Sequence, residues 1–303
     1  MLKRIVTAVC ILAVLFGCIF GLRSLEFQLA DILTVLAFLG VFEMYQAFKR
    51  AGYKPIPTAL ILGCVAAFPL TYFFMADGVM LTLAVVTISA LIIFTLKHNL
   101  GEAKPENEES DVPVKEGYSL NDMFATIFVG IYPLSLFMLF LPVNHSEAGL
   151  LGIMLIIAVP VMADTMAYFT GMAIGKRKLC PQISPKKTVA GAVGGIIGGI
   201  IGALIVFFLF DYSGAMSVFP NAGSMELIKG NLYGSLGLYI ALGVVGGALG
   251  ELGDLAASWI KRKAGIKDFG KLFPGHGGIM DRLDSILFML PLVYLVFAVS
   301  GIC

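Results

Sequence analysis

Charged residues are scarce in this sequence: only 14% of the 303 residues are charged, and 58% are hydrophobic. A soluble globular domain has about a quarter charged and about half apolar residues. This shortage of charge excludes an ordinary soluble domain. The apolar residues fall into blocks close to the ~20 residues with which a helix crosses a bilayer. The composition therefore predicts an all-α polytopic membrane protein.

Cysteine is also scarce. The five cysteines are scattered, and no spacing among them fits a disulfide framework or a zinc site. We therefore interpret them as small apolar side chains. The first apolar run, which ends at Leu22, is long for a signal peptide and is not followed by an A-x-A cleavage site, so we expect it to be a membrane helix.

Nine blocks qualify as membrane helices, because backbone groups that face lipid must find hydrogen-bond partners within their own segment. They cover Ile5–Leu22, Phe27–Phe48, Pro57–Met75, Gly78–Leu96, Met123–Pro142, Ala148–Gly171, Gly191–Phe210, Leu232–Ala256 and Leu283–Ile302. With the N-terminus in the cytoplasm, only Arg23 and Lys229 of the 21 Lys and Arg residues lie outside. The positive-inside rule thus predicts a cytoplasmic N-terminus and an external C-terminus.

One polar stretch interrupts the apolar blocks. Residues 98–122 are acidic and contain Pro105 and Pro113. Such a composition cannot bury a core, so we expect a flexible cytoplasmic linker. It would separate an N-terminal four-helix region, residues 1–97, from a C-terminal five-helix region, residues 123–303, in which we place the chemistry.

Glycines recur at a spacing of four in the seventh and eighth blocks. The seventh has two ridges, Gly191, Gly195 and Gly199 on one and Gly194, Gly198 and Gly202 on the other, and the eighth has Gly243, Gly246, Gly247 and Gly250. This spacing lets helix backbones approach closely. Because these glycines lie deep in apolar sequence, we favour tight helix packing over a phosphate-binding loop.

Ionisable residues inside membrane segments are costly and usually face a bundle interior or a wet cavity. Asp164 precedes Tyr168 by four residues and Gly171 by seven, so the three share one helix face. That face leads into a basic loop that contains residues 184–188, SPKKT, which we expect to bind substrate. The alternative interpretation is that its lysines only follow the positive-inside rule and that its Ser-Pro pair begins a helix. Asp31 and Glu43 lie near span ends, and the sequence leaves open whether they are merely interfacial.

The densest polar segment lies just before the last block. Asp254, Ser258 and Lys261 form one stripe at i, i+4 and i+7 of a helix, and Asp281 and Asp284 share another face. The turn between these helices is rich in Gly and Pro, which lets backbone N–H groups approach a ligand.

These residue types indicate phosphate chemistry. Neighbouring carboxylates repel unless a cation lies between them, and oxygen ligands favour a hard ion such as Mg²⁺, which usually binds one or two carboxylates together with substrate phosphates. The nearby basic side chains supply the charge that a polyphosphate needs. They are Lys261, Arg262, Lys267 and Arg282.

The same segment resembles the signature of phosphatidate cytidylyltransferases (CDP-diacylglycerol synthases). The similarity is carried by residues 258–262, SWIKR, by 267–270, KDFG, and by 274–284, PGHGGIMDRLD, and residues 164–171 and 184–188 also resemble family segments. The resemblance covers roughly Asp164 to Ser285. Two departures are Ala190, where the family often has Glu, and a more basic approach to the Pro-Gly-His turn at Lys271.

The resemblance implies transfer of the cytidylyl group of CTP to phosphatidic acid, giving CDP-diacylglycerol and pyrophosphate for phospholipid biosynthesis. It implies a multi-pass protein of the cell membrane with its site on the cytoplasmic side, Mg²⁺ as cofactor, and no nucleic-acid partner. A second cation and a homodimer are left open.

The residues that match the motifs receive roles from this resemblance. The expected metal ligands are Asp254 and Asp281, followed by Asp284 and Asp268. The expected catalytic residues are Asp254, Asp281, Lys261, Arg262, Lys267 and His276, the last as a hydrogen-bond donor or an organiser of the turn. The expected substrate-binding residues are Asp164, Tyr168, Ser184, Lys186, Lys187, Thr188, Ser258, Gly277, Gly278 and Arg282.

Two other hypotheses stay open. A CTP-dependent polyprenol or dolichol kinase shares basic and glycine-rich loops but would release CDP instead of pyrophosphate. An ion-coupled transporter would also use buried carboxylates and broken helices, although the two halves of the sequence show no convincing inverted repeat.

Overall fold

The computed structural model describes residues 29–101, 117–218, 222–224, 232–270, 272 and 277–302. Almost all of its regular structure is helical. In chain order the elements are α2 (Leu29–Arg50), α3 (Pro57–Gly101), α4 (Leu120–Val129), the π-helical η2 (Gly130–Ser135), α5 (Leu136–Met138), α6 (Phe140–His145), α7 (Gly149–Ile174), β1 (Lys178–Cys180), β2 (Ser184–Thr188), α8 (Val189–Phe207), η3 (Phe208–Tyr212), η4 (Ala215–Val218), α10 (Leu232–Lys263) and α11 (Met280–Val299).

Six helical segments in the described part of the chain are long and apolar enough to cross a membrane. They are Pro57–Lys97, Leu120–His145, Gly149–Ile174, Val189–Tyr212, Leu232–Lys263 and Met280–Val299. This confirms a helical, multi-pass membrane protein. The first expected span, Ile5–Leu22, lies outside the described residues, so the count of nine spans stays a prediction.

The longest of these helices, α3, is interrupted at Met75, whose backbone has φ 49° and ψ −121°. A Cβ added at Gly63 would collide with the side chain of Val86. In one straight helix, residues 23 apart would be separated by roughly 35 Å. The chain therefore turns back on itself near Met75, and the two expected spans Pro57–Met75 and Gly78–Leu96 lie side by side.

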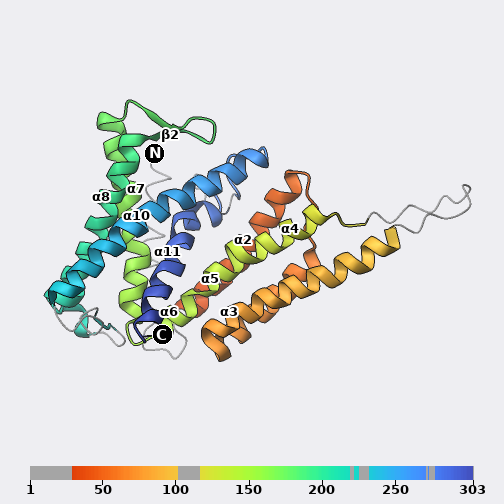
Figure 1. The fold of residues 1–303 in the computed structure, drawn as a ribbon, viewed down its shortest axis with the longest axis horizontal. Helices are drawn as coiled ribbons and strands as arrows, with labels where there is room; N and C mark the ends of the chain where they lie inside the picture. Colours follow the sequence, from red (N-terminus) through yellow and green to blue (C-terminus); the bar gives the residue numbers. More distant parts are fainter. Residues whose placement is uncertain are drawn as a thin grey trace, which may run out of the picture.

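The helices pack in two groups (Figure 1). In the first, α7, α8, α10 and α11 contact one another extensively; we call it the α7–α11 bundle. In the second, the run α4–α6 packs mainly against α2 and α3; we call it the α2–α6 group. Most of the expected linker, residues 102–116, lies outside the described part, so the domain boundary stays a prediction.

Glycines allow the close approach within the α7–α11 bundle. A Cβ at Gly198 or Gly202 would collide with a carbonyl oxygen of α7, and one at Gly199 would collide with the carbonyl oxygen of Gly243 in α10. The ridge of Gly194, Gly198 and Gly202 therefore faces α7. In the other ridge, Gly195 and Gly199 face α10, whereas Gly191 meets α7. This confirms the interpretation of these glycines as helix-packing positions.

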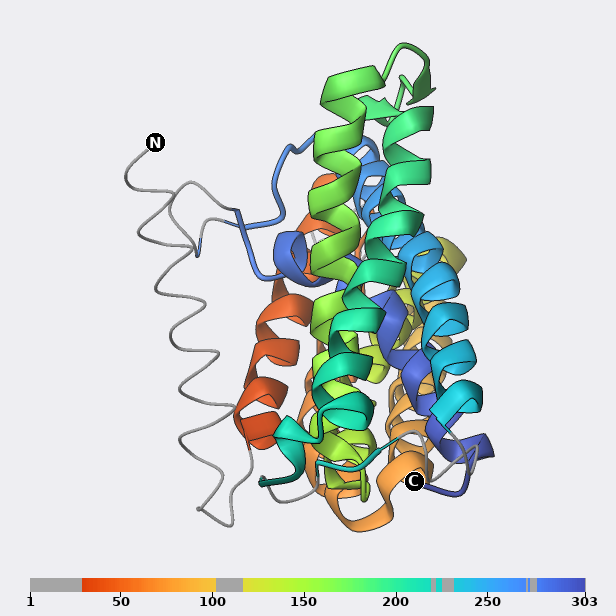
Figure 2. The same ribbon diagram turned by 90° about the vertical axis from the view of Figure 1, so that its left-hand side faces the viewer.

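The loop between α7 and α8 departs from the all-α expectation. Its strands β1 and β2 pair antiparallel, with Lys178 opposite Thr188 and Cys180 opposite Ser184. Thr188 also begins α8, because its hydroxyl accepts a hydrogen bond from the Gly191 N–H at 3.0 Å. The hairpin projects from one end of the bundle, whereas the chain ends at the other (Figure 2).

Candidate active site

A cavity of about 440 Å³ opens where α7, the hairpin, α8, α10 and α11 meet. Five carboxylates line it, together with three lysines from the hairpin, and we call it the carboxylate pocket. The acidic residues are Asp164, Glu251, Asp254, Asp281 and Asp284, and the basic residues are Lys178, Lys186 and Lys187. Eight residues expected from the sequence line this one cavity: Asp164, Tyr168, Lys186, Lys187, Thr188, Asp254, Asp281 and Asp284.

Helix α7 contributes the face that the sequence spacing indicates. Asp164, Tyr168 and Gly171 all line the pocket, although they span seven residues of the helix. Tyr168 remains 66% exposed, so its ring is accessible at the rim. The face therefore supplies a carboxylate and an aromatic ring to the lining of the pocket, and both side chains are exposed.

Lys187 ties the hairpin to α10. Its Nζ lies 2.9 Å from Asp254 Oδ2 and forms a second ion pair with Glu251. Burial alone would lower the pKa of Lys187, but the two carboxylates outweigh burial, and the pKa is raised above its ordinary value. The amine therefore stays protonated at neutral and mildly alkaline pH, and its charge is lost as the pH rises through that raised pKa.

Asp281 fastens the turn that precedes α11. Its Oδ1 lies 2.8 Å from Lys261 Nζ, and its Oδ2 accepts hydrogen bonds from the N–H groups of Phe269 at 2.8 Å and Gly278 at 2.9 Å. The side chains of Asp281 and Lys261 are 4% and 13% exposed. Both oxygens of Asp281 are thus engaged by protein donors, which a bound metal would have to share or displace.

Asp254 and Asp284 accept fewer hydrogen bonds from the protein than Asp281 does, although Asp254 is also paired with Lys187. Ser258 is 3.5 Å from Asp254 Oδ1, at the limit of a hydrogen bond. Asp284 is 7% exposed, and its Oδ1 accepts the N–H of the adjacent Ser285 at 2.9 Å. Its burial beside other carboxylates is unfavourable unless a cation compensates.

No three His, Cys, Asp or Glu side chains in the described ranges are close enough to form a metal site as they stand. The charge of the pocket nevertheless fits a cation, because five carboxylates meet three lysines from the hairpin and one of the five is paired with Lys261. A hard divalent ion with oxygen ligands suits this donor set better than a soft one.

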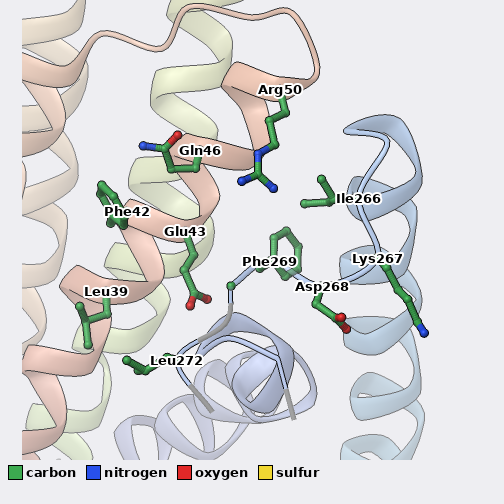
Figure 3. Close-up of a pocket in the computed structure, with 11 residues that line it drawn as sticks. Leu39, Phe42, Glu43, Gln46, Arg50, Ile266, Lys267, Asp268, Phe269 and Leu272 are labelled. Atoms are coloured by element: carbon green, nitrogen blue, oxygen red, sulfur yellow. The ribbon is translucent and has the colours of Figure 1, made fainter. Parts of the chain in front are cut away.

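Two expected site residues lie in a different cavity. Lys267 and Asp268 line a cavity of about 730 Å³ between α2 and the segment after α10, which we call the α2 cavity. Figure 3 shows Arg50, Glu43 and Phe269 directed toward it, with Lys267 turned away from α2. Its lining is otherwise mostly apolar: Leu39, Phe42, Ile266 and Leu272 contribute. Asp268 is therefore not brought into the carboxylate pocket.

The end of α10 explains this separation. Gly265 has φ +66°, and the N–H of Ile266 bonds back to the carbonyl of Lys261 at 2.9 Å. This αL cap ends the helix and reverses the chain. The chain beyond it thus lines the cavity beside α2, whereas Asp254 and Ser258 remain on the helix.

The other expected residues occupy supporting positions. Arg262 is exposed, and its Nε donates to the Ile183 carbonyl at 3.2 Å, which joins α10 to the hairpin. Gly277 has φ +84°, a conformation that favours glycine. Ser184 is half-buried at the start of β2, Gly278 is buried, Arg282 is exposed on the first turn of α11, and His276 lies outside the described residues.

Glu251 and Glu43 were not among the expected site residues. Glu251 lies three residues before Asp254, and this spacing could have assigned it to the same face. Glu43 is 8% exposed and accepts hydrogen bonds from the N–H groups of Ile279 and Met280. It is therefore a buried structural partner of α11, a role that no local pattern indicates.

Comparison with known proteins identifies the family of the chain. Residues 2–300 match the cytidylyltransferase family. A phosphatidate cytidylyltransferase of Bacillus subtilis (strain 168) is 30% identical over 303 residues, which cover 98% of each chain. One from Staphylococcus saprophyticus is 36% identical over 150 residues, half of each chain, and one from Staphylococcus aureus (strain COL) is 36% identical over 132 residues, 44% of this chain and 43% of that one. The chain belongs to the cytidylyltransferase family.

Proposed function

We propose that the protein is a phosphatidate cytidylyltransferase that makes CDP-diacylglycerol for phospholipid biosynthesis. A phosphate oxygen of phosphatidic acid attacks the α-phosphorus of CTP, the bond from that phosphorus to the β-phosphate oxygen breaks, and pyrophosphate leaves. The observation that carries the proposal is the gathering of the signature residues Asp164, Lys187, Asp254 and Asp284 around one cavity. Such a transfer depends mainly on positioning and charge neutralisation.

We assign the CTP phosphates to the carboxylate pocket. Lys186 and Lys187 would contact phosphate oxygens from the hairpin, and Lys178 is a third cation on the same lining. Asp254 and Asp284, with Asp164, would hold Mg²⁺, whereas Asp281 mainly orders the turn. When bound, the ion supplies positive charge that offsets the charge of the triphosphate.

We assign the lipid phosphate to the α2 cavity, which borders the turn fastened by Asp281. Arg50 provides positive charge on the same helix as the apolar side chains Leu39 and Phe42, and Lys267 lines the side of the cavity away from α2. This combination suits an acyl glycerol phosphate, whose head is anionic and whose tails are apolar. Phe269 lines this cavity, and its N–H bonds to Asp281, a residue of the carboxylate pocket.

We further propose that nine spans place the N-terminus and the site on the cytoplasmic side of the cell membrane. The support is that the basic hairpin and the C-terminus lie at opposite ends of the bundle (Figure 2). A membrane-impermeant thiol reagent should label Cys303 in intact cells. It should not label Ser110→Cys in a Cys303→Ala background. Labelling with the opposite sidedness would contradict this topology.

The assay that tests the activity uses purified protein, radiolabelled CTP and phosphatidic acid, with and without Mg²⁺. We expect labelled CDP-diacylglycerol and pyrophosphate, and little product without the ion. Release of CDP with diacylglycerol or a polyprenol as acceptor would favour the kinase hypothesis. Ion flux across sealed vesicles without nucleotide turnover would favour a transporter. Cross-linking in native membranes would test the homodimer, which we keep as a proposal.

A further inference from the structure

Helix α11 begins with a cap that comes from a distant part of the chain. Glu43 of α2 accepts hydrogen bonds at 3.1 Å from the N–H of Ile279 and at 3.0 Å from the N–H of Met280. The first N–H groups of a helix have no partner within it, and Ile279 at the N-cap position provides no side-chain cap. A residue 236 positions away thus satisfies this buried helix start.

The carboxylate of Glu43 is enclosed by two segments of the loop between α10 and α11. A Cβ added at Gly270 would collide with Glu43 Oε1, and one added at Gly278 would collide with both carboxylate oxygens. The two glycines lie close together, since a Cβ on Gly270 would be 3.1 Å from the Cα of Gly278. Because glycine has no side chain, these two positions leave room for the carboxylate of Glu43.

Asp281 binds the same two segments from the side of the carboxylate pocket. It accepts the N–H of Phe269, which precedes Gly270, and the N–H of Gly278, which precedes Ile279. Glu43 binds the two N–H groups that follow Gly278, which belong to Ile279 and Met280. The turn is therefore held between two carboxylates, one from the α2–α6 group and one that lines the pocket.

We infer that Glu43 is a positioning residue for the cytidylyl transfer, an inference that rests on the proposed function. Its carboxylate fixes the Gly278–Met280 turn, and the turn sets the position of Asp281 and Asp284 in the pocket. The α2–α6 group thereby takes part in the reaction without contributing a side chain to the carboxylate pocket.

The test compares Glu43→Gln with Asp122→Asn in the full-length protein. Asp122 is a matched control, because it is also buried and also accepts two backbone N–H groups, from Lys54 at 2.6 Å and Ser119 at 2.9 Å. Glutamine keeps the size of Glu43 but presents an amide donor to one of the two N–H groups. We expect kcat per folded molecule to fall about tenfold to a hundredfold in Glu43→Gln, and about twofold or less in Asp122→Asn.

Hydrogen–deuterium exchange provides a readout independent of turnover. In Glu43→Gln, exchange should accelerate in residues 277–284 while the rest of α10 and α11 stays protected. In Asp122→Asn it should accelerate only around α4. If Glu43→Gln disturbs folding, Gly270→Ala tests the same contact with Glu43 intact, and its effect should shrink in a Glu43→Ala background.

Three outcomes for Glu43→Gln would overturn the inference. The first is wild-type kcat together with wild-type exchange, and the second is a kcat loss per folded molecule no larger than that of Asp122→Asn. The third is a kcat loss without faster exchange at residues 277–284. Failure of the proposed function is recognised separately, because the wild-type protein would then make no CDP-diacylglycerol while the exchange pattern still reports on the contact.

Discussion

The two helix groups are assembled by different means. In the α7–α11 bundle, glycines such as Gly199 and Gly202 let backbones touch, and carboxylates and lysines occupy the space that remains at one end. In the α2–α6 group, contacts are made by large side chains, for example between the rings of Phe48 and Phe128 at 5.6 Å. The comparison indicates that close backbone packing accompanies the carboxylate pocket, whereas the α2–α6 group contributes one wall of the α2 cavity and the hydrogen bonds of Glu43.

The strongest test of this comparison is within the pocket. We expect Asp254→Asn to lower the rate about a hundredfold or more, as loss of a key electrostatic stabiliser does elsewhere, with thermal unfolding little changed. Asp281→Asn should lower the rate and also destabilise the fold by about 3 kcal/mol, because it leaves Lys261 buried without its partner. Activity and thermal unfolding of both variants check this. Near-normal activity of Asp254→Asn at limiting Mg²⁺ would contradict its role as a metal ligand.

A smaller effect is expected where the bundle depends on glycine. Gly199→Ala places a Cβ against the backbone of Gly243 and Gly247, and such overpacking costs about 1–3 kcal/mol. Gly237→Ala is the matched control in α10, since no other atom lies within 4 Å of its added Cβ, and it should be neutral or stabilising by up to about 1 kcal/mol. Thermal unfolding in detergent measures both. Equal melting temperatures would show that the ridge does not limit packing.

The smallest effect concerns the α2 cavity. Arg50→Ala should raise the KM for phosphatidic acid by up to about fivefold, as expected for one exposed charge, and leave the KM for CTP unchanged. Lys49→Ala is the control, because Lys49 is exposed in the same helical turn but does not line the cavity. A change in the KM for CTP larger than that in the KM for phosphatidic acid would indicate that Arg50 binds the nucleotide instead.

Much of this arrangement could be predicted from sequence because it depends on local periodicity. Hydropathy predicted the helical, multi-pass class, the glycine spacing predicted the close packing of α8, and the i, i+4 spacing of Asp164 and Tyr168 predicted their shared face. The β1–β2 hairpin was not predicted, since its strands are short and polar and are held by distant contacts such as Lys187 with Asp254.

Two features of the arrangement depend on contacts that are distant in sequence. Lys267 and Asp268 were grouped with Asp254 because they are near it in sequence, but the αL turn at Gly265 directs them to another cavity. The sequence leaves the role of Glu43 open because its hydrogen-bond partners lie at the far end of the chain. In both cases the deciding information is three-dimensional and leaves no local pattern.

The length of α10 links the pocket to the thickness of the bilayer. Its 32 residues span about 48 Å, whereas the hydrocarbon core measures about 30 Å. Asp254 and Lys261 lie in its last third, toward its basic end. Because a helix is rigid over this length, the depth of the pocket carboxylates in the membrane depends on the tilt of α10. The tilt changes with bilayer thickness, so turnover should vary with the acyl-chain length of the bulk lipid even when the substrate lipid is kept the same.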